Sequence, residues 1–160
     1  MPFTMETTGM DELEKKIGQL GDRGQQMAAV ALYEGAGVMA DAVSQAVQGI
    51  ETEPFRYAAG GRTRKPSPEE KAILENARKG VSKFRKSPIR VDTSVGMQNS
   101  GYAELAGKTV PIPLIANAIN SGTSFRKKQP FFRKAESKSG AAEAAIENKL
   151  REQLESLSAE

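Results

Sequence analysis

Apolar side chains recur three and four residues apart over a long stretch that begins after Gly21. This spacing predicts a core-facing helix over residues 22–49, with Asp22 as its N-cap. The apolar stripe consists of Leu32, Ala36, Met39, Val43, Val47 and Ile50. A row of small residues beside it would let another backbone approach closely, namely Ala28, Ala31, Gly35, Ala42 and Ala46. Ordinary core packing and a dedicated subunit interface both fit this row, and we favour core packing.

Two shorter helices are indicated by capping signals. Thr8 and Asp11 have the spacing of a capping box before an apolar stripe, so a short amphipathic helix should end at Gly21. Ser67 then supplies an N-cap, Pro68 fits the first helical position, and the two acids that follow favour the positive end of the helix dipole. We expect this helix to run to about Lys79.

The C-terminal residues 136–160 have a further helical stripe. We expect this stripe to lie against the 22–49 helix, and it consists of Ala142, Ile146, Leu150, Leu154 and Leu157. A shorter helix is predicted over residues 114–121, with Gly122 as its left-handed C-terminal cap.

Strand signals lie between these helices. Apolar and polar residues alternate from Ile89 to Val95 after an interruption at Ser87–Pro88, which predicts a β-hairpin. Residues 96–107 are interpreted as a polar connection that Tyr102 and Leu105 anchor. Residues 110–113 should be extended, because each of their two prolines restricts the residue before it.

The predicted fold class is therefore α+β, in one domain that spans residues 1–160. A small antiparallel sheet is packed by a long N-terminal helix and a C-terminal helix, with long basic loops. The parts are a helical region (1–50), a polar loop (51–68), a region with a helix, a hairpin and two short motifs (69–135), and the last helix (136–160). The 51–68 and 96–113 loops are candidates for contact with neighbours.

Composition argues against catalysis. The chain has no His and no Cys, so imidazole bases, thiol nucleophiles, disulfides and Cys/His zinc sites are all excluded. Ser94 and Ser121 lie near glycines but have no base to activate them, and Glu69 and Glu70 are ordinary helix-start acids. We expect no enzyme activity, no cofactor and no metal. No apolar run reaches the length of a membrane span, so we expect a soluble protein that starts out in the cytoplasm.

Charge is distributed unevenly along the chain. Residues 51–138 contain 18 Lys and Arg against 8 Asp and Glu, whereas the chain as a whole carries only +3. A basic middle with acidic ends suits nucleic-acid contact, and it equally suits self-assembly of acidic against basic faces.

The most distinctive stretch is residues 115–135, IANAINSGTSFRKKQPFFRKA. Basic side chains surround three aromatic residues here, an arrangement that can contact phosphates and stack bases. The alternative is that the aromatics anchor the loop in the core while the basic side chains stay in water. We favour this alternative, because a Gln-Pro-Phe-Phe step that leads into a helix resembles a hydrophobic staple.

A short helix that ends in Gly-Thr, a short loop, and Gln-Pro-Phe before the final helix resembles the tail-completion, or minor tail component, family of long-tailed bacteriophages and prophages. The matching residues are Ala118, Gly122, Thr123, Gln129, Pro130, Phe131, Phe132 and Ala135. Members often carry an acidic residue shortly before the Gly-Thr, where this chain has Asn120, and the 96–113 segment looks like an elaboration.

The resemblance implies a non-enzymatic virion protein at the head-proximal end of the tail, assembled in the bacterial cytoplasm. Its implied partners are copies of itself in a ring and tail terminator, tail tube or neck proteins, with non-specific DNA contact and no membrane. Seven basic residues are the candidates for contact with DNA or a partner: Arg62, Arg64, Lys65, Arg126, Lys127, Lys128 and Arg133. The alternative function is a stand-alone nucleic-acid-binding module that uses the basic and aromatic loop.

Overall fold

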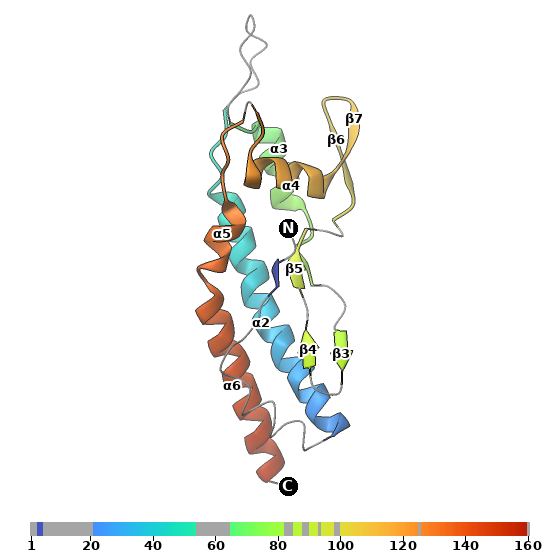
Figure 1. Cartoon of the computed structure of the whole chain (residues 1–160), viewed down its shortest axis with the longest axis vertical. Helices are drawn as coiled ribbons and strands as arrows, with labels where there is room; N and C mark the ends of the chain where they lie inside the picture. Colours follow the sequence, from blue (N-terminus) through green and yellow to red (C-terminus); the bar gives the residue numbers. More distant parts are fainter. Residues whose placement is uncertain are drawn as a thin grey trace, which may run out of the picture.

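The computed structural model describes residues 3–4, 21–53, 65–81, 85–87, 90–92, 94–97, 100–124 and 126–159. It confirms the predicted α+β class. Helix α2 (Asp22–Gln48) is the longest element, and α6 (Ser139–Ser158) lies antiparallel beside it (Figure 1). Helix α5 (Phe131–Glu136) precedes α6 on the same side of α2. The predicted helix before Gly21 and most of the predicted 51–68 loop lie outside the described residues.

Helices α2 and α6 approach each other closely at Gly35. A Cβ at this position would lie 2.5 Å from Cγ1 of Ile146 and 3.2 Å from the carbonyl oxygen of Ala142. Ala31, Ile146 and Leu150 are buried together in the same contact. The small residues of α2 therefore accommodate α6 of the same chain, which is the core packing that the sequence favoured.

The predicted stripe on α2 faces the core. Ala36, Met39, Val43, Val47 and Ile50 are buried, and Leu32 is half-buried. The predicted cap is wrong by one position. The helix begins at Asp22 itself, and the cap residue is Gly21, whose φ of 65° a glycine adopts without strain.

Helix α3 (Pro68–Asn76) begins as predicted, with a complete capping box between Ser67 and Glu70. It ends three residues before the predicted end, because Ala77 is already extended. The Lys79 ammonium replaces the missing turn by donating to the carbonyl oxygens of Leu74 (2.8 Å) and Glu75 (2.7 Å). Burial lowers the pKa of Lys79 from its ordinary value.

Within the described residues the strands form three antiparallel sheets, whereas the sequence predicted one small antiparallel sheet. One sheet has the order β1 (Phe3–Thr4), β5 (Ser94–Gly96) and β2 (Gly80–Val81). The second pairs β3 (Arg85–Ser87) with β4 (Arg90–Asp92), which confirms the predicted hairpin across Ser87. The third pairs β6 (Tyr102–Leu105) with β7 (Lys108–Pro111).

The β6–β7 hairpin was missed by the sequence analysis, which interpreted residues 96–107 as a connection. Its two turn residues, Ala106 and Gly107, both have positive φ (50° and 74°). Positive φ at both central residues is typical of a type I′ turn, the two-residue turn whose twist matches a hairpin. Of the two predicted anchors, Leu105 packs against the core, whereas the side chain of Tyr102 is exposed.

Helix α4 (Ile112–Ser121) begins two residues before its predicted start, and Pro113 is tolerated in its first turn. Its buried face joins the largest core cluster, together with the C-terminal half of α2, α3 and α5. These elements lie at one end of α2, from which the β6–β7 hairpin projects (Figure 1). Among the residues that the structure describes, no helix is both long enough and apolar enough to cross a membrane.

Candidate functional site

Half of the matching motif residues lie in the connection between α4 and α5, residues 122–130, which we call the joint. They are Gly122, Thr123, Gln129 and Pro130, while Ala118 lies in α4 and Phe131, Phe132 and Ala135 lie in α5. Gly122 opens it with a φ of 75° and an extended ψ of 176°, so its backbone is not the left-handed helical cap that was predicted. A Cβ at Gly122 would lie only 3.0 Å from Arg126 O and from Lys128 N and Cβ. Glycine is therefore required by both the positive φ and the close approach of the returning chain.

Thr123 closes the loop that Gly122 opens. Its backbone N–H donates to the Arg126 carbonyl oxygen (3.2 Å), and its hydroxyl oxygen accepts from the Arg126 N–H (3.2 Å). A hydroxyl side chain commonly stabilises a turn in this way. The Gly-Thr pair is thus a local turn that directs the chain back over α4.

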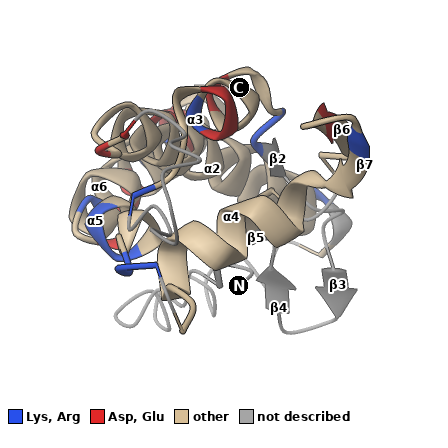
Figure 2. Cartoon of the chain, turned by 90° about the horizontal axis from the view of Figure 1, so that it is seen from above, with Lys and Arg blue, Asp and Glu red and all other residues tan. Residues whose placement is uncertain are grey.

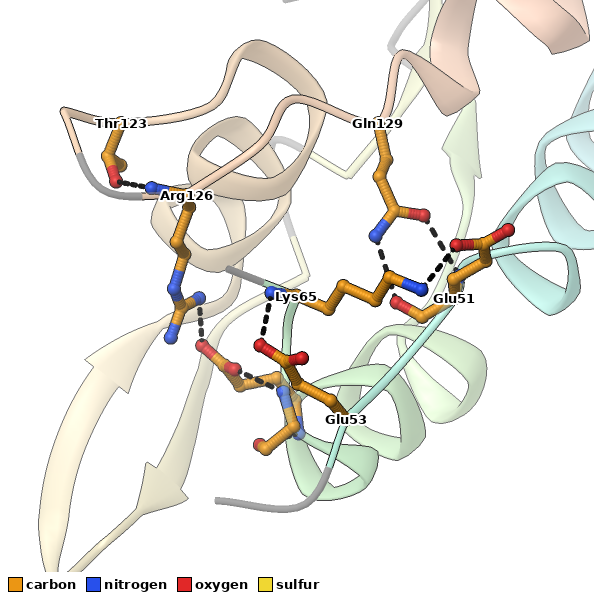
Figure 3. Close-up of polar contacts among 8 residues, drawn as sticks. Glu51, Glu53, Lys65, Thr123, Arg126 and Gln129 are labelled. Atoms are coloured by element: carbon orange, nitrogen blue, oxygen red, sulfur yellow. Dashed lines mark hydrogen bonds and ion pairs between the residues drawn. The ribbon is translucent and has the colours of Figure 1, made fainter. Parts of the chain in front are cut away.

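Gln129 ties the joint to the end of α2. Its side-chain oxygen accepts from the Glu51 backbone N–H (2.9 Å), and its side-chain nitrogen donates to the Glu51 carbonyl oxygen (2.9 Å) (Figure 3). A carboxamide carries one donor group and one acceptor and can therefore satisfy both backbone groups of one residue. The Gln129 backbone N–H also donates to Ile119 O in α4 (2.9 Å).

Pro130 makes the next bend. Its φ of −77° and ψ of 70°, with the Phe131 N–H donating to Gln129 O (2.8 Å), define an inverse γ-turn. The proline ring holds φ near the value that this turn requires, and Pro130 has no N–H to leave unpaired. The Gln129–Pro130–Phe131 step therefore sets the direction in which α5 starts.

Two buried aromatic rings fix α5 in the core. Phe131 is 1% exposed and Phe132 is 8% exposed, and their ring centroids lie 4.5 Å apart. The prediction that the aromatic residues anchor this stretch in the core is confirmed for Phe131 and Phe132. Phe125 lies outside the described residues. The comparison with a hydrophobic staple was wrong, because Gln129 precedes the cap and Lys134 occupies the fourth helical position.

Asn120 supplies the hydrogen bond that α5 lacks at its cap. The Pro130 side chain has no polar atom and cannot cap the helix. Instead, the Asn120 side-chain oxygen accepts a hydrogen bond from the Phe132 N–H (3.2 Å). This bond satisfies one of the unpaired donors of the first turn. The role needs only an oxygen acceptor, which an aspartate would provide equally.

Arg126 is half-buried and is bound by an acidic side chain of the same chain. Its guanidinium donates to one carboxylate oxygen of Glu70, whose other oxygen accepts from the Ser67 N–H (2.8 Å) (Figure 3). Glu70 is only 5% exposed. Its carboxylate both completes the capping box of α3 and binds Arg126 of the joint. The candidate Arg126 therefore has an intramolecular partner, although the sequence suggested that it could contact DNA.

Lys65 also has an intramolecular partner. Its ammonium lies 2.8 Å from a carboxylate oxygen of Glu51. The hydrogen bond and the positive charge of Lys65 lower the pKa of Glu51, and Glu51 in turn raises the pKa of Lys65. The two ends of the 51–68 loop are further joined by Lys65 N–H to Glu53 Oε1 (2.9 Å) and Glu53 N–H to Pro66 O (3.0 Å).

The remaining described candidates, Lys127, Lys128 and Arg133, are exposed. Lys134 and Lys138, which were not among the candidates, are exposed on the same segment, and Figure 2 shows basic residues gathered at α5 and the joint. Arg62 and Arg64 lie outside the described residues. In the part of the chain that the structure describes, no three acidic side chains lie close enough together to hold a metal ion.

Sequence reasoning missed Glu51, Glu70 and Asn120 as partners of the joint. Glu70 was recognised only as a helix-start acid, because a capping box is a local signal whereas its bond to Arg126 spans 56 positions. Comparison with protein-family models, with curated proteins and with solved structures found no match.

Proposed function

We propose that this chain is a structural virion protein that completes the head-proximal end of a phage tail or its joint to the head. It would act by assembling with copies of itself and with tail terminator, tail tube or neck proteins. No catalytic step is part of this proposal, in keeping with a chain that has neither His nor Cys.

The proposal is carried by one observation, which is that the motif residues act together in one connection held by hydrogen bonds and core packing. Gly122 and Thr123 form a turn, Gln129 binds the end of α2, Pro130 bends the chain, and Phe131 enters the core. Such a connection suits a part that must hold its shape against neighbours, because a preorganised surface loses less entropy on binding.

Asn120 is a departure from the family's pattern that is compatible with the proposal. Members often carry an acidic residue near this position, and in this chain Asn120 accepts a hydrogen bond from the first turn of α5. An acidic side chain at this position would offer the same kind of oxygen acceptor.

The surface available to partners is basic. Lys127 and Lys128 lie on the joint, Arg133 and Lys134 lie on α5, and Lys138 lies between α5 and α6. Because Arg126 and Lys65 are engaged by Glu70 and Glu51, the proposed contact surface consists of the other five cations. An acidic surface on a neighbouring subunit would complement it.

These same five cations favour a second candidate, a stand-alone nucleic-acid-binding module. The burial of Phe131 and Phe132 removes two of the three rings that could have stacked on bases, which weakens this candidate. We therefore place it second. Tight DNA binding by the isolated chain with a steep salt dependence would favour it over the structural role.

The direct test uses light scattering and size-exclusion chromatography of the chain, alone and mixed with the tail and neck proteins that neighbouring genes encode. The proposal predicts complexes that the double variant Lys127→Glu/Lys128→Glu weakens. Lys108→Glu, which reverses an exposed charge on β7 instead, serves as the control. A chain that stays monomeric with every one of these proteins would contradict the proposed function.

A further inference from the structure

The β6–β7 hairpin presents two edges of different character. The two-residue turn makes Leu105 and Lys108 a hydrogen-bonded pair, and pairing alternates from there along the ladder. The Ile112 N–H, which donates to Gly101 O (3.0 Å), shows the same alternation continuing beyond the strands. It follows that the backbone groups of Tyr102 and Glu104 point outward from β6, and those of Thr109 and Pro111 point outward from β7.

The edge of β7 is blunted because Pro111 has no N–H where the strand would otherwise offer one. Proline at such a position is a common protection against edge-to-edge pairing. The edge of β6 has no such protection. Within the described part of the chain no strand pairs with it, so Tyr102 and Glu104 each offer a free N–H and a free carbonyl oxygen.

We propose that the outer edge of β6 pairs antiparallel with the same edge of a second copy of this chain. In the register that places Ala103 opposite its counterpart, Tyr102 faces Glu104 of the other copy, and Glu104 faces its Tyr102. This register uses all four outward donors and all four outward acceptors in four hydrogen bonds. If the register shifted by two residues so that Glu104 faced Glu104, the two carboxylates would lie directly opposite each other, which is destabilising.

Side chains on the outer face favour the same register. Tyr102 is 72% exposed, which is unusual for a ring of this size, and pairing would cover it with the stem of Glu104 from the second copy. The Glu104 carboxylate is already held over the hairpin, since it accepts from the Thr109 hydroxyl (2.7 Å). Ala103 at the centre has a small side chain that lets the strands approach.

The pairing is isologous and closes as a two-fold dimer, whereas a ring needs head-to-tail contacts. It therefore goes beyond the proposed tail role and does not rest on it. The partner is defined chemically as a second β6 strand, with no acidic or basic protein required.

Sedimentation of the purified full chain tests the pairing with two matched proline variants. Glu104→Pro removes an outward N–H from β6 and leaves the hairpin ladder intact, while Thr109→Pro does the same on β7. We expect a monomer–dimer equilibrium that Glu104→Pro weakens by about tenfold or more, and that Thr109→Pro leaves unchanged. Equal effects of the two variants, or a wild-type chain that is monomeric at all concentrations, would overturn the proposal.

Cross-linking gives a readout that does not depend on those variants folding well. The chain has no cysteine, so a single introduced thiol can bridge only between copies. Ala103→Cys should form a disulfide dimer on mild oxidation, because opposed residues at this type of pair lie within disulfide reach. Val110→Cys, at the paired position on β7, should not. Equal cross-linking of the two variants would overturn the proposal. A larger ring that Glu104→Pro leaves intact would also overturn it, but such a ring would remain compatible with the proposed tail role.

Discussion

The side-chain amide of Gln129 forms two hydrogen bonds with the backbone of one residue, Glu51, which lies 78 positions earlier in the chain. Through this pair, the connection before the last two helices is fastened to the end of the first long helix. The bond explains why an amide is suited to the position, since both a donor and an acceptor are needed at one side-chain end.

Gln129→Glu should lower the free energy of unfolding by about 1 kcal/mol, the usual net contribution of one hydrogen bond. The carboxylate can still accept from the Glu51 N–H, but it can no longer donate to the Glu51 carbonyl oxygen. Urea denaturation checks the effect. Gln26→Glu, an exposed position on α2, makes the same chemical change and should alter stability by less than about 0.5 kcal/mol. Equal effects of the two variants would show that the amide pair contributes nothing.

The ion pair between Arg126 and Glu70 should contribute more, because Glu70 is nearly inaccessible to water. Arg126→Met should lower the free energy of unfolding by about 1.5 to 3 kcal/mol, the range for hydrogen bonds to charged groups. Lys128→Met, on the same loop with an exposed side chain, is the control. A double-mutant cycle with Glu70→Gln isolates the pair, and a coupling energy near zero would contradict its anchoring role.

Two neighbouring positions, Pro130 at the end of the joint and Phe131 at the start of α5, should respond differently to alanine. Phe131→Ala removes a buried ring and should cost about 3 to 5 kcal/mol of stability. Pro130→Ala leaves the core intact and should cost only about 0.4 to 1 kcal/mol, through the greater freedom of the unfolded chain. Thermal and urea unfolding measure both. Similar small losses in the two variants would mean that the stretch is a linker without a structural role.

The contact between α2 and α6 predicts opposite outcomes at two glycines of one helix. Gly35→Ala should destabilise the protein by about 1 to 3 kcal/mol, because the added methyl group meets Ile146 and the Ala142 carbonyl oxygen. Gly37→Ala has nothing within 4 Å and should stabilise the protein by about 0.5 to 1 kcal/mol, since alanine favours the helix. Stabilisation by both substitutions would contradict the close helix contact.

The Glu51–Lys65 pair predicts a pH dependence. Because the pKa of Glu51 is lower in the folded state than its ordinary value of 4.5, its contribution to stability is present above that pH. The contribution is lost as the pH falls through the folded pKa. In Lys65→Met the Glu51 pKa, followed by carboxyl carbon NMR, should rise towards 4.5, and the corresponding part of the acid dependence of unfolding should disappear. An unchanged pKa would show that the pair does not form in solution.

Helices α2 and α3 were predictable because their signals are local. The stripe from Ala36 to Ile50 and the capping box of Ser67 and Glu70 each lie within a few turns of one segment. The β6–β7 hairpin was missed since Ala106–Gly107 is not among the strongest turn pairs, and an alanine at positive φ departs from the residues that such turns favour.

The motif residues of the joint could be picked out from the sequence, but their partners could not. Gln129 binds Glu51 and Arg126 binds Glu70. The partners of each pair lie far apart in the chain, so no periodic pattern in the sequence indicates the contact. The sequence therefore suggested more basic side chains available to contact a partner than the structure leaves. Only the folded chain shows that Arg126 is anchored while Lys127 and Lys128 beside it are exposed.

We propose that the joint shapes a surface for assembly. This is tested by comparing wild-type and Pro130→Ala chains in complex formation with the neighbouring tail and neck proteins. Light scattering of the mixtures should show complexes with the wild type and clearly fewer with Pro130→Ala at a temperature where both chains are folded. Complex formation that is the same for both chains, or absent for the wild type with every partner, would contradict the claim.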